Sequence, residues 1–196
     1  MEPGSTVLGV EITERRFHTV YSLSAEVGID RPRLSRLLKK IGHVPSDATE
    51  VEIGTMVFDA AEAVFLIEAF KTAVPLQDVP EYLGASKGQV EILYRSGIVK
   101  PLVPRTGRGS VRHVVFGRQH LDGLLRQLLA FTEMDADTCS VYHPIAVACQ
   151  RGAGPFEDGS RRILAGQIPC FRNHEKSGIG SICVYVNAIV AAKRPA

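Results

Sequence analysis

Three pairs of glycines constrain the fold of this chain most strongly, because the two members of each pair lie at nearly the same interval, about 14 residues. The pairs are Gly28 and Gly42, Gly84 and Gly97, and Gly152 and Gly166. In each repeat, an apolar helical pattern precedes the first glycine and a second helical pattern lies between the two glycines. A strand-like segment with an aromatic residue follows. Since glycine supplies the positive φ that ends many helices, the pattern predicts three units of two helices, a tight turn and a strand.

We expect these repeats to occupy residues 15–72, 73–132 and 133–192. The predicted fold class is mainly α with small β-wings, arranged as tandem winged helix-turn-helix units. The third repeat is degenerate, because Gly159 falls inside its second predicted helix, where glycine is unfavourable. An irregular helical protein with glycines placed by chance remains the alternative.

Local residues indicate where the helices begin. Asp30 suits an N-cap position, and Pro32 falls in the first turn that follows, where proline is tolerated. Ser86 and Gln89 form the S-x-x-Q pattern of a capping box. Pro155 suits the first position of a helix in the third repeat. These signals support the second helix of every repeat.

The second repeat carries the clearest predicted wing. The stretches 99–104 and 111–116 are extended patterns joined by a Gly-rich turn at 106–110. Apolar residues at helical spacing then predict a closing helix over 119–129, and residues 60–70 take that part in the first repeat.

The second helix of a helix-turn-helix enters the major groove, with its N-terminal residues leading. Glutamine can pair with adenine and arginine with guanine in that groove. Residues 92–121 include no acidic residue, which favours phosphate contact by the wing. A solvated basic hairpin without a ligand is the alternative. The candidate DNA contacts of this repeat are Lys87, Gln89, Tyr94, Arg95, Arg105, Arg108 and Arg112.

The first repeat has a basic second helix, whose leucines fix its buried face and turn its cations outward. Its candidate DNA contacts are Arg31, Arg33, Arg36, Lys39 and Lys40. The region after this helix, where a wing is expected, is acidic and would repel phosphate; it would bind a protein or form a solvated face. The third repeat offers Arg161, Arg172 and Lys176, with a candidate wing turn at 178–180.

The net charge is only +2, so DNA binding would depend on the local distribution of charge. The chain shows no nucleotide-binding or nucleophile motif, and we expect no enzymatic activity and no cofactor. Its four cysteines lack a C-x-x-C pair, which indicates reduced thiols; zinc bound by Cys139, His143 and Cys149 is the weaker alternative. We expect a cytoplasmic protein without membrane contact, because neither a signal peptide nor a spanning apolar run is visible.

Residues 79–129 resemble the winged helix of the MerR and excisionase type, from Pro-Glu-Tyr-Leu-Gly to the Gly-Arg-Gly turn. With the segments 163–168 and 180–186, the three repeats are similar to the C-terminal region of TniQ-type transposition proteins. That resemblance implies double-stranded DNA as a partner, target selection in transposition or recombination, and an AAA+ ATPase as a second partner. A homodimer is a further expectation. The alternative functions are a protein-assembly scaffold and a transcription regulator.

Overall fold

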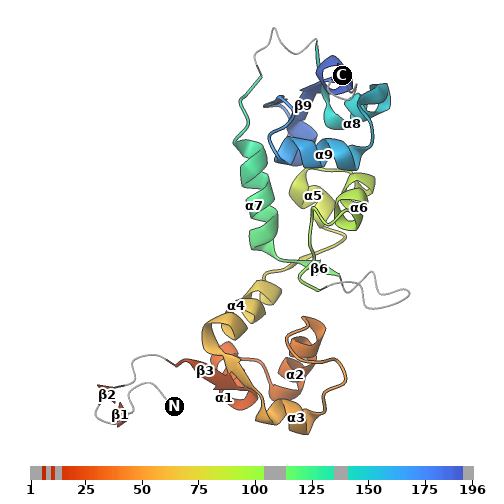
Figure 1. Cartoon of the computed structure of the whole chain (residues 1–196). Helices are drawn as coiled ribbons and strands as arrows, with labels where there is room; N and C mark the ends of the chain where they lie inside the picture. The colour runs from red at the N-terminus through yellow and green to blue at the C-terminus, as the bar shows by residue number, and fades with distance from the viewer. Residues whose placement is uncertain (1–5, 8–9, 12–14, 104–113, 135–140, 192–196) are drawn as a thin grey trace. The chain divides into compact units, whose positions relative to one another are not determined.

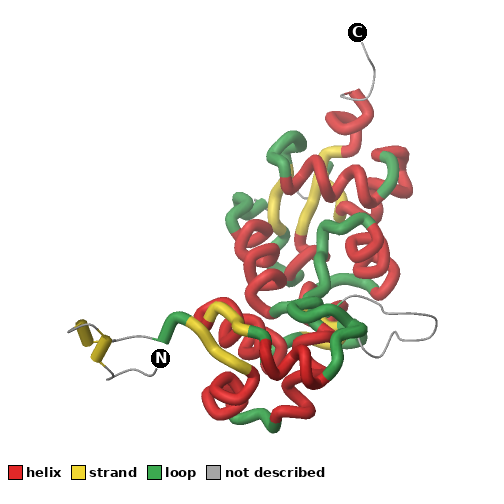
Figure 2. The backbone as a smooth tube through the Cα atoms, turned by 60° about the horizontal axis from the view of Figure 1, so that its bottom comes forward, coloured by secondary structure: helices red, strands yellow, loops and turns green. Residues whose placement is uncertain are grey.

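The computed structural model describes residues 6–7, 10–11, 15–103, 114–134 and 141–191 of the chain. The described part is mainly helical with small antiparallel sheets (Figures 1 and 2). The sheets are β1-β2, β3-β4, β5-β6 and the three-stranded β7-β9-β8. The chain divides into two compact lobes. We name them the N-terminal lobe (residues 1–73 and 102–115) and the C-terminal lobe (residues 74–101 and 116–196).

In the N-terminal lobe, short helices surround one apolar core, and the strands form two two-stranded antiparallel sheets. Its strands are β1 (Thr6–Val7), β2 (Val10–Glu11), β3 (Phe17–Thr19) and β4 (Val57–Asp59), and its helices are α1 (Val20–Val27), α2 (Arg31–Lys40), α3 (Glu50–Thr55) and α4 (Ala60–Lys71). Strands β3 and β4 pair antiparallel, with His18 opposite Phe58. Leu23, Leu34 and Ile53 are fully buried at the centre of this core. Helices α1, α2, α3 and α4 therefore share one hydrophobic interior.

The turn between α1 and α2 is set by residues that the sequence singles out. Gly28 ends α1 with φ 67° in the left-handed region. Asp30 then caps α2, since its carboxylate accepts a hydrogen bond from the backbone N–H of Arg33 at 3.1 Å. The N-cap prediction at Asp30 is confirmed. A glycine turn and a capped helix in succession fix the direction in which α2 leaves α1.

The acidic region predicted as the wing of the first repeat contains helix α3 instead. Thr49 caps α3, and the Glu52 side chain accepts a hydrogen bond from the Thr49 backbone N–H at 2.6 Å, which completes a capping box. Ile53 turns inward from α3 into the core. The expectation of a wing here is therefore wrong, because residues 50–55 form a capped helix that buries Ile53.

The C-terminal lobe combines two further helix pairs. Its elements are β5 (Val74–Pro75), α5 (Val79–Leu83), α6 (Lys87–Arg95), β6 (Val115–Phe116), α7 (Arg118–Leu129), β7 (Tyr142–Pro144), α8 (Ile145–Ala148), the π-helix η3 (Cys149–Ala153), α9 (Phe156–Leu164), β8 (Cys170–Arg172), the 3-10 helix η4 (Gly178–Ser181), β9 (Ile182–Tyr185) and α10 (Val186–Ala191). Helix α6 packs on α9, while α5 and α7 pack on η4. The third predicted repeat and most of the second thus belong to one compact lobe, while residues 102–115 of the second belong to the N-terminal lobe.

An order of strand, helix, helix, strand and helix recurs three times along the chain, with α3 inserted in the first series and η3, β8 and η4 inserted in the third. The series are β3-α1-α2-β4-α4, β5-α5-α6-β6-α7 and β7-α8-α9-β9-α10. Within each series the first strand pairs with the later one. The later strands and closing helices lie where the sequence predicts them, whereas the short strand before each first helix is an addition.

The third repeat docks on the second through a backbone contact that only glycine permits. The N–H of Gly180 donates a hydrogen bond to the carbonyl of Gly84 at 2.9 Å. Gly178 has φ 55°, and a Cβ on it would overlap the Leu83 carbonyl. The prediction of a wing turn at 178–180 is wrong, because this segment is a largely buried 3-10 helix packed against the end of α5.

Candidate nucleic-acid interface

Helix α2 separates its apolar and cationic residues onto two sides. Leu34, Leu37 and Leu38 are buried in the core of the N-terminal lobe. Arg31, Arg33 and Arg36 are exposed, and the two lysines at the end of the helix, Lys39 and Lys40, are half-exposed. The structure therefore brings all five cations predicted on this helix to its solvent-facing side, and α2 itself includes no acidic residue.

Two of these cations lie over aromatic rings. The guanidinium carbon of Arg31 lies 5.5 Å from the ring centroid of Tyr21, a residue of α1. At the other end of the helix, Lys40 Nζ lies 6.0 Å from the ring centroid of Phe70, a residue of α4. Cation–π contacts of this kind restrain long side chains without neutralising their charge. At each end of α2, an aromatic ring from a neighbouring helix thus restrains a cationic side chain.

Arg33 and Arg36, which lie between these two ends of α2, make local contacts. Arg33 Nε lies 3.4 Å from the carboxylate of Asp30, and both side chains are well exposed. Arg36 Nε donates a hydrogen bond to the Pro32 carbonyl at 3.1 Å. An exposed ion pair is worth little in water and gives way easily to a stronger anion. These arginines are held near the helix surface and remain able to meet phosphate or base edges.

Sequence reasoning missed Tyr21. It lies beside the buried Val20 at the start of α1, and its own side chain is 71% exposed. The sequence could have indicated it, because Tyr21 is an aromatic residue that does not belong to the apolar face formed by Val20, Leu23 and Val27. Such a residue is easily counted as core when only the apolar pattern is considered.

Helix α6 offers less free positive charge than α2. The Gln89 side chain accepts a hydrogen bond from the Ser86 backbone N–H at 2.7 Å, which confirms the predicted capping box. Arg95 pairs with Glu91 at 2.5 Å. Tyr94 packs edge-on against Phe116, with 5.7 Å between the ring centroids. Of the four predicted contacts on α6, Lys87 is exposed and makes no ion pair among the described residues.

The cations of the third repeat are mostly engaged within the C-terminal lobe. Arg161 pairs with Glu157 at 3.2 Å and also donates to the carbonyl of Ser96. Arg172 pairs with Glu133, and its own side chain is only 23% exposed. Lys176 is exposed. The predicted wing contacts Arg105, Arg108 and Arg112 lie outside the described residues, although the wing stretches pair at their base, where Val103 bridges Val115.

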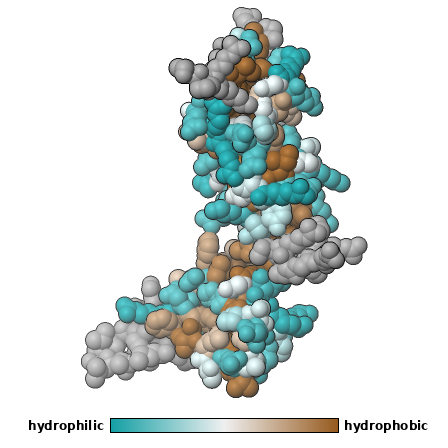
Figure 3. Space-filling view, turned by 45° about the vertical axis from the view of Figure 1, so that its right-hand side comes forward, coloured by the Kyte–Doolittle hydropathy of each residue, from teal (hydrophilic) through white to brown (hydrophobic). Residues whose placement is uncertain are grey.

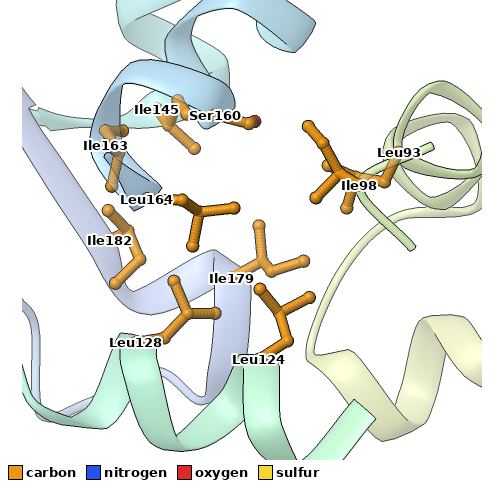
Figure 4. Close-up of a pocket in the computed structure, with 10 residues that line it drawn as sticks. All are labelled: Leu93, Ile98, Leu124, Leu128, Ile145, Ser160, Ile163, Leu164, Ile179 and Ile182. Atoms are coloured by element: carbon orange, nitrogen blue, oxygen red, sulfur yellow. The ribbon is translucent and has the colours of Figure 1, made fainter. Parts of the chain in front are cut away.

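A small apolar cavity lies inside the C-terminal lobe. Its volume is about 30 Å³, which corresponds to the space of one or two water molecules. Ser160 provides the single polar side chain of the lining, and its hydroxyl already donates to the Phe156 carbonyl at 2.7 Å. Figure 4 shows aliphatic side chains from α6, α7, α9 and β9 around this space. This space is far smaller than the roughly 300–1,000 Å³ of small-molecule sites.

Two titratable groups, the buried His18 and the half-buried Cys170, belong to the structure rather than to a site. His18 Nδ1 lies 3.0 Å from the Ser22 hydroxyl beneath the start of α1, and burial, with a contribution from Arg15, lowers the pKa of His18. Burial raises the pKa of the Cys170 thiol to about 11. Neither group lies on the exposed side of α2.

Comparison with known proteins gives no match to a family model, a curated protein or a solved structure. Within the described ranges, every helix is too short or too polar to cross a membrane. The same ranges include no group of three metal-binding side chains suited to an ion. Figure 3 shows a face that is mostly hydrophilic, with smaller hydrophobic areas. The basic side of α2 is therefore the candidate interface among the described residues.

Proposed function

We propose that this protein binds duplex DNA through its tandem helix-turn-helix units, with α2 as the principal contact. The carrying observation is the cationic side of α2, which presents Arg31, Arg33, Arg36, Lys39 and Lys40 while its leucines hold the helix on the core. An α-helix with its side chains is roughly 10–12 Å across, which matches the roughly 12 Å width of the major groove, and the ten residues of α2 extend about 15 Å along the helix axis. Charge and dimensions therefore both suit insertion of α2 into that groove.

The low net charge of +2 supports a localised contact over nonspecific attraction. Carboxylates of α3 and of α4, such as Glu50, Glu52 and Glu62, would repel phosphate from those elements. DNA would consequently approach the N-terminal lobe from the side of α2. In the C-terminal lobe, Lys87 and Arg95 of α6 would add backbone contacts of lesser strength, because Glu91 already pairs with Arg95.

The experiment is a fluorescence-anisotropy titration of a labelled duplex of random sequence with the full chain. Arg36→Glu reverses one charge on the exposed side of α2, and the matched control Arg126→Glu makes the same change on α7. We expect Arg36→Glu to weaken binding on the order of tenfold at moderate salt, because it replaces a phosphate attraction by a repulsion. The control should change affinity less than threefold. Equal effects of the two variants, or no binding by the unmodified chain, would overturn the proposal.

Assembly with another protein is a second candidate, favoured by apolar residues on the surface of the N-terminal lobe. Phe17 and Val57 are 59% and 61% exposed on the outward face of the β3-β4 sheet, and Phe65 of α4 is 57% exposed. A stable complex with a partner, formed by a chain that has no affinity for DNA, would select this function. The transposition context rests on the resemblance to TniQ-type proteins, and co-purification with an AAA+ ATPase tests it.

A further inference from the structure

Tyr21 occupies a position that the fold itself does not require. Helix α1 buries Val20, Leu23 and Val27 against the core, whereas the Tyr21 ring is 71% exposed. An aromatic side chain left this open gains little from burial. Its role is therefore better sought in what it contacts at the surface.

The contact that Tyr21 makes is with α2. Its ring lies under the guanidinium of Arg31, with 5.5 Å between the guanidinium carbon and the ring centroid. Arg31 is the first residue of α2, so the pair joins the beginnings of two successive helices across the turn at Gly28. Stacking on an aromatic face leaves the N–H donors of a guanidinium free at its edge.

We propose that Tyr21 and Arg31 form a phosphate clamp at the edge of the α2 interface; this inference rests on the proposed DNA-binding function. The Arg31 guanidinium would bind two oxygens of one phosphate in bidentate fashion. The Tyr21 hydroxyl would donate to the same phosphate, and its ring would hold Arg31 in place. Tyrosine hydroxyls and arginines are both regular ligands of the DNA backbone.

Position on the helix separates this clamp from Arg36, the cation that tests the proposed function. Arg36 lies in the middle of the helix, between the buried Ser35 and Leu37, and points away from the core. Arg31 lies at the start of the helix and contacts α1. In helix-turn-helix complexes the first helix crosses the sugar-phosphate backbone while the second enters the groove. Although Arg31 begins the second helix, its contact with Tyr21 holds it beside the first helix, where the backbone passes. Its loss should therefore weaken binding to all sequences alike.

The test is a double-mutant cycle on full-length protein, with affinity for labelled duplexes of two unrelated sequences measured by anisotropy. Arg31→Ala should weaken binding about tenfold and reduce the salt slope by about 1, equally on both duplexes. Tyr21→Leu should weaken it about fivefold and Tyr21→Phe about twofold, since the phenyl ring keeps Arg31 in place. In the Arg31→Ala background, Tyr21→Leu should have less than half of its effect in the parent.

Arg36→Glu serves as the reference for the proposed function itself. If Arg36→Glu weakens binding while the Tyr21 and Arg31 variants are silent or strictly additive, the clamp is refuted and DNA binding by α2 stands. If Arg36→Glu has no effect, the proposed function fails. Because Tyr21 is exposed, Tyr21→Leu should leave the urea midpoint unchanged; should that variant lose stability, Tyr21→Phe and Arg31→Ala still decide the outcome.

Discussion

Replacing Gly178 with alanine should destabilise the C-terminal lobe far more than the same change at another left-handed glycine. Gly178 lies in η4, where its backbone packs against the end of α5. A Cβ at this position would overlap the carbonyl group of Leu83. Because the overlapping atoms belong to the backbone, no side-chain rotation can relieve the overlap, and η4 must move away from α5.

The magnitude follows from two separate costs. A residue with a Cβ pays roughly 1–2 kcal/mol to adopt positive φ, and Gly178 has φ 55°. Forcing extra volume into a packed region costs roughly 1–3 kcal/mol more. Together these give a loss of about 2–5 kcal/mol in the free energy of unfolding. Gly166 has φ 68° and no atom within 4 Å of a Cβ, so Gly166→Ala should show the first cost alone.

Urea denaturation followed by circular dichroism measures both variants, and hydrogen exchange locates the change. We expect faster exchange over residues 79–84 and 178–182 in Gly178→Ala, but not in Gly166→Ala. If the two variants lose equal stability, the close approach of η4 to α5 does not hold the second and third repeats together, and the account of this lobe is refuted.

Two pH-dependent results are also expected. Because burial lowers the pKa of His18, the neutral ring is favoured in the folded state, and stability should fall as pH drops below about 6.5; an NMR titration of His18 with a midpoint above 6.5 would contradict this. Because burial raises the pKa of Cys170 to about 11, its thiol should react more slowly with DTNB at pH 8 than the same thiol in urea. Equal DTNB reactivity in the folded protein and in urea would show that the Cys170 thiol is not shielded. The same pKa shift should make the free energy of unfolding fall as pH rises from about 9 towards 11.

Much of the fold can be predicted because short-range chemistry encodes it. The side chain of Asp30 and the pair Ser86 and Gln89 make the capping bonds that their positions suggest. Glycines at the predicted helix ends adopt positive φ, as Gly97 and Gly166 do. These features depend on residues within one turn of the chain, and so the sequence alone reveals them.

Other features depend on contacts that are distant in sequence or too short to form a pattern. Strands such as β3, with three residues, are too brief to show alternation before a helix. Gly159 is tolerated inside α9, where it faces Ile145; a Cβ there would lie 3.6 Å from Ile145 Cδ1, an ordinary packing distance. The docking of Gly178 on α5 joins segments more than 90 positions apart. Helix α3, by contrast, carries the T-x-x-E signature at Thr49 and Glu52 and could have been predicted.

For the candidate site, the outward face of α2 can be predicted from its leucine spacing. The ion pairs that engage arginines outside α2 cannot be predicted in this way. Whether an arginine is displayed or engaged depends on carboxylates brought close by the fold. Arg172 meets Glu133 only because the chain returns beside the end of α7. Charge counted along the sequence therefore overstates the contribution of the third repeat.

The salt dependence of duplex binding tests the central claim most directly. With at least three cations of α2 on phosphates, a plot of log K against log salt concentration should have a slope of about −3 or steeper. Removing two of those charges by Lys39→Ala and Lys40→Ala together should make the slope less negative by about 2, with the fold unchanged by circular dichroism. A slope near zero for the unmodified protein, or an identical slope in the double variant, would contradict DNA binding by α2.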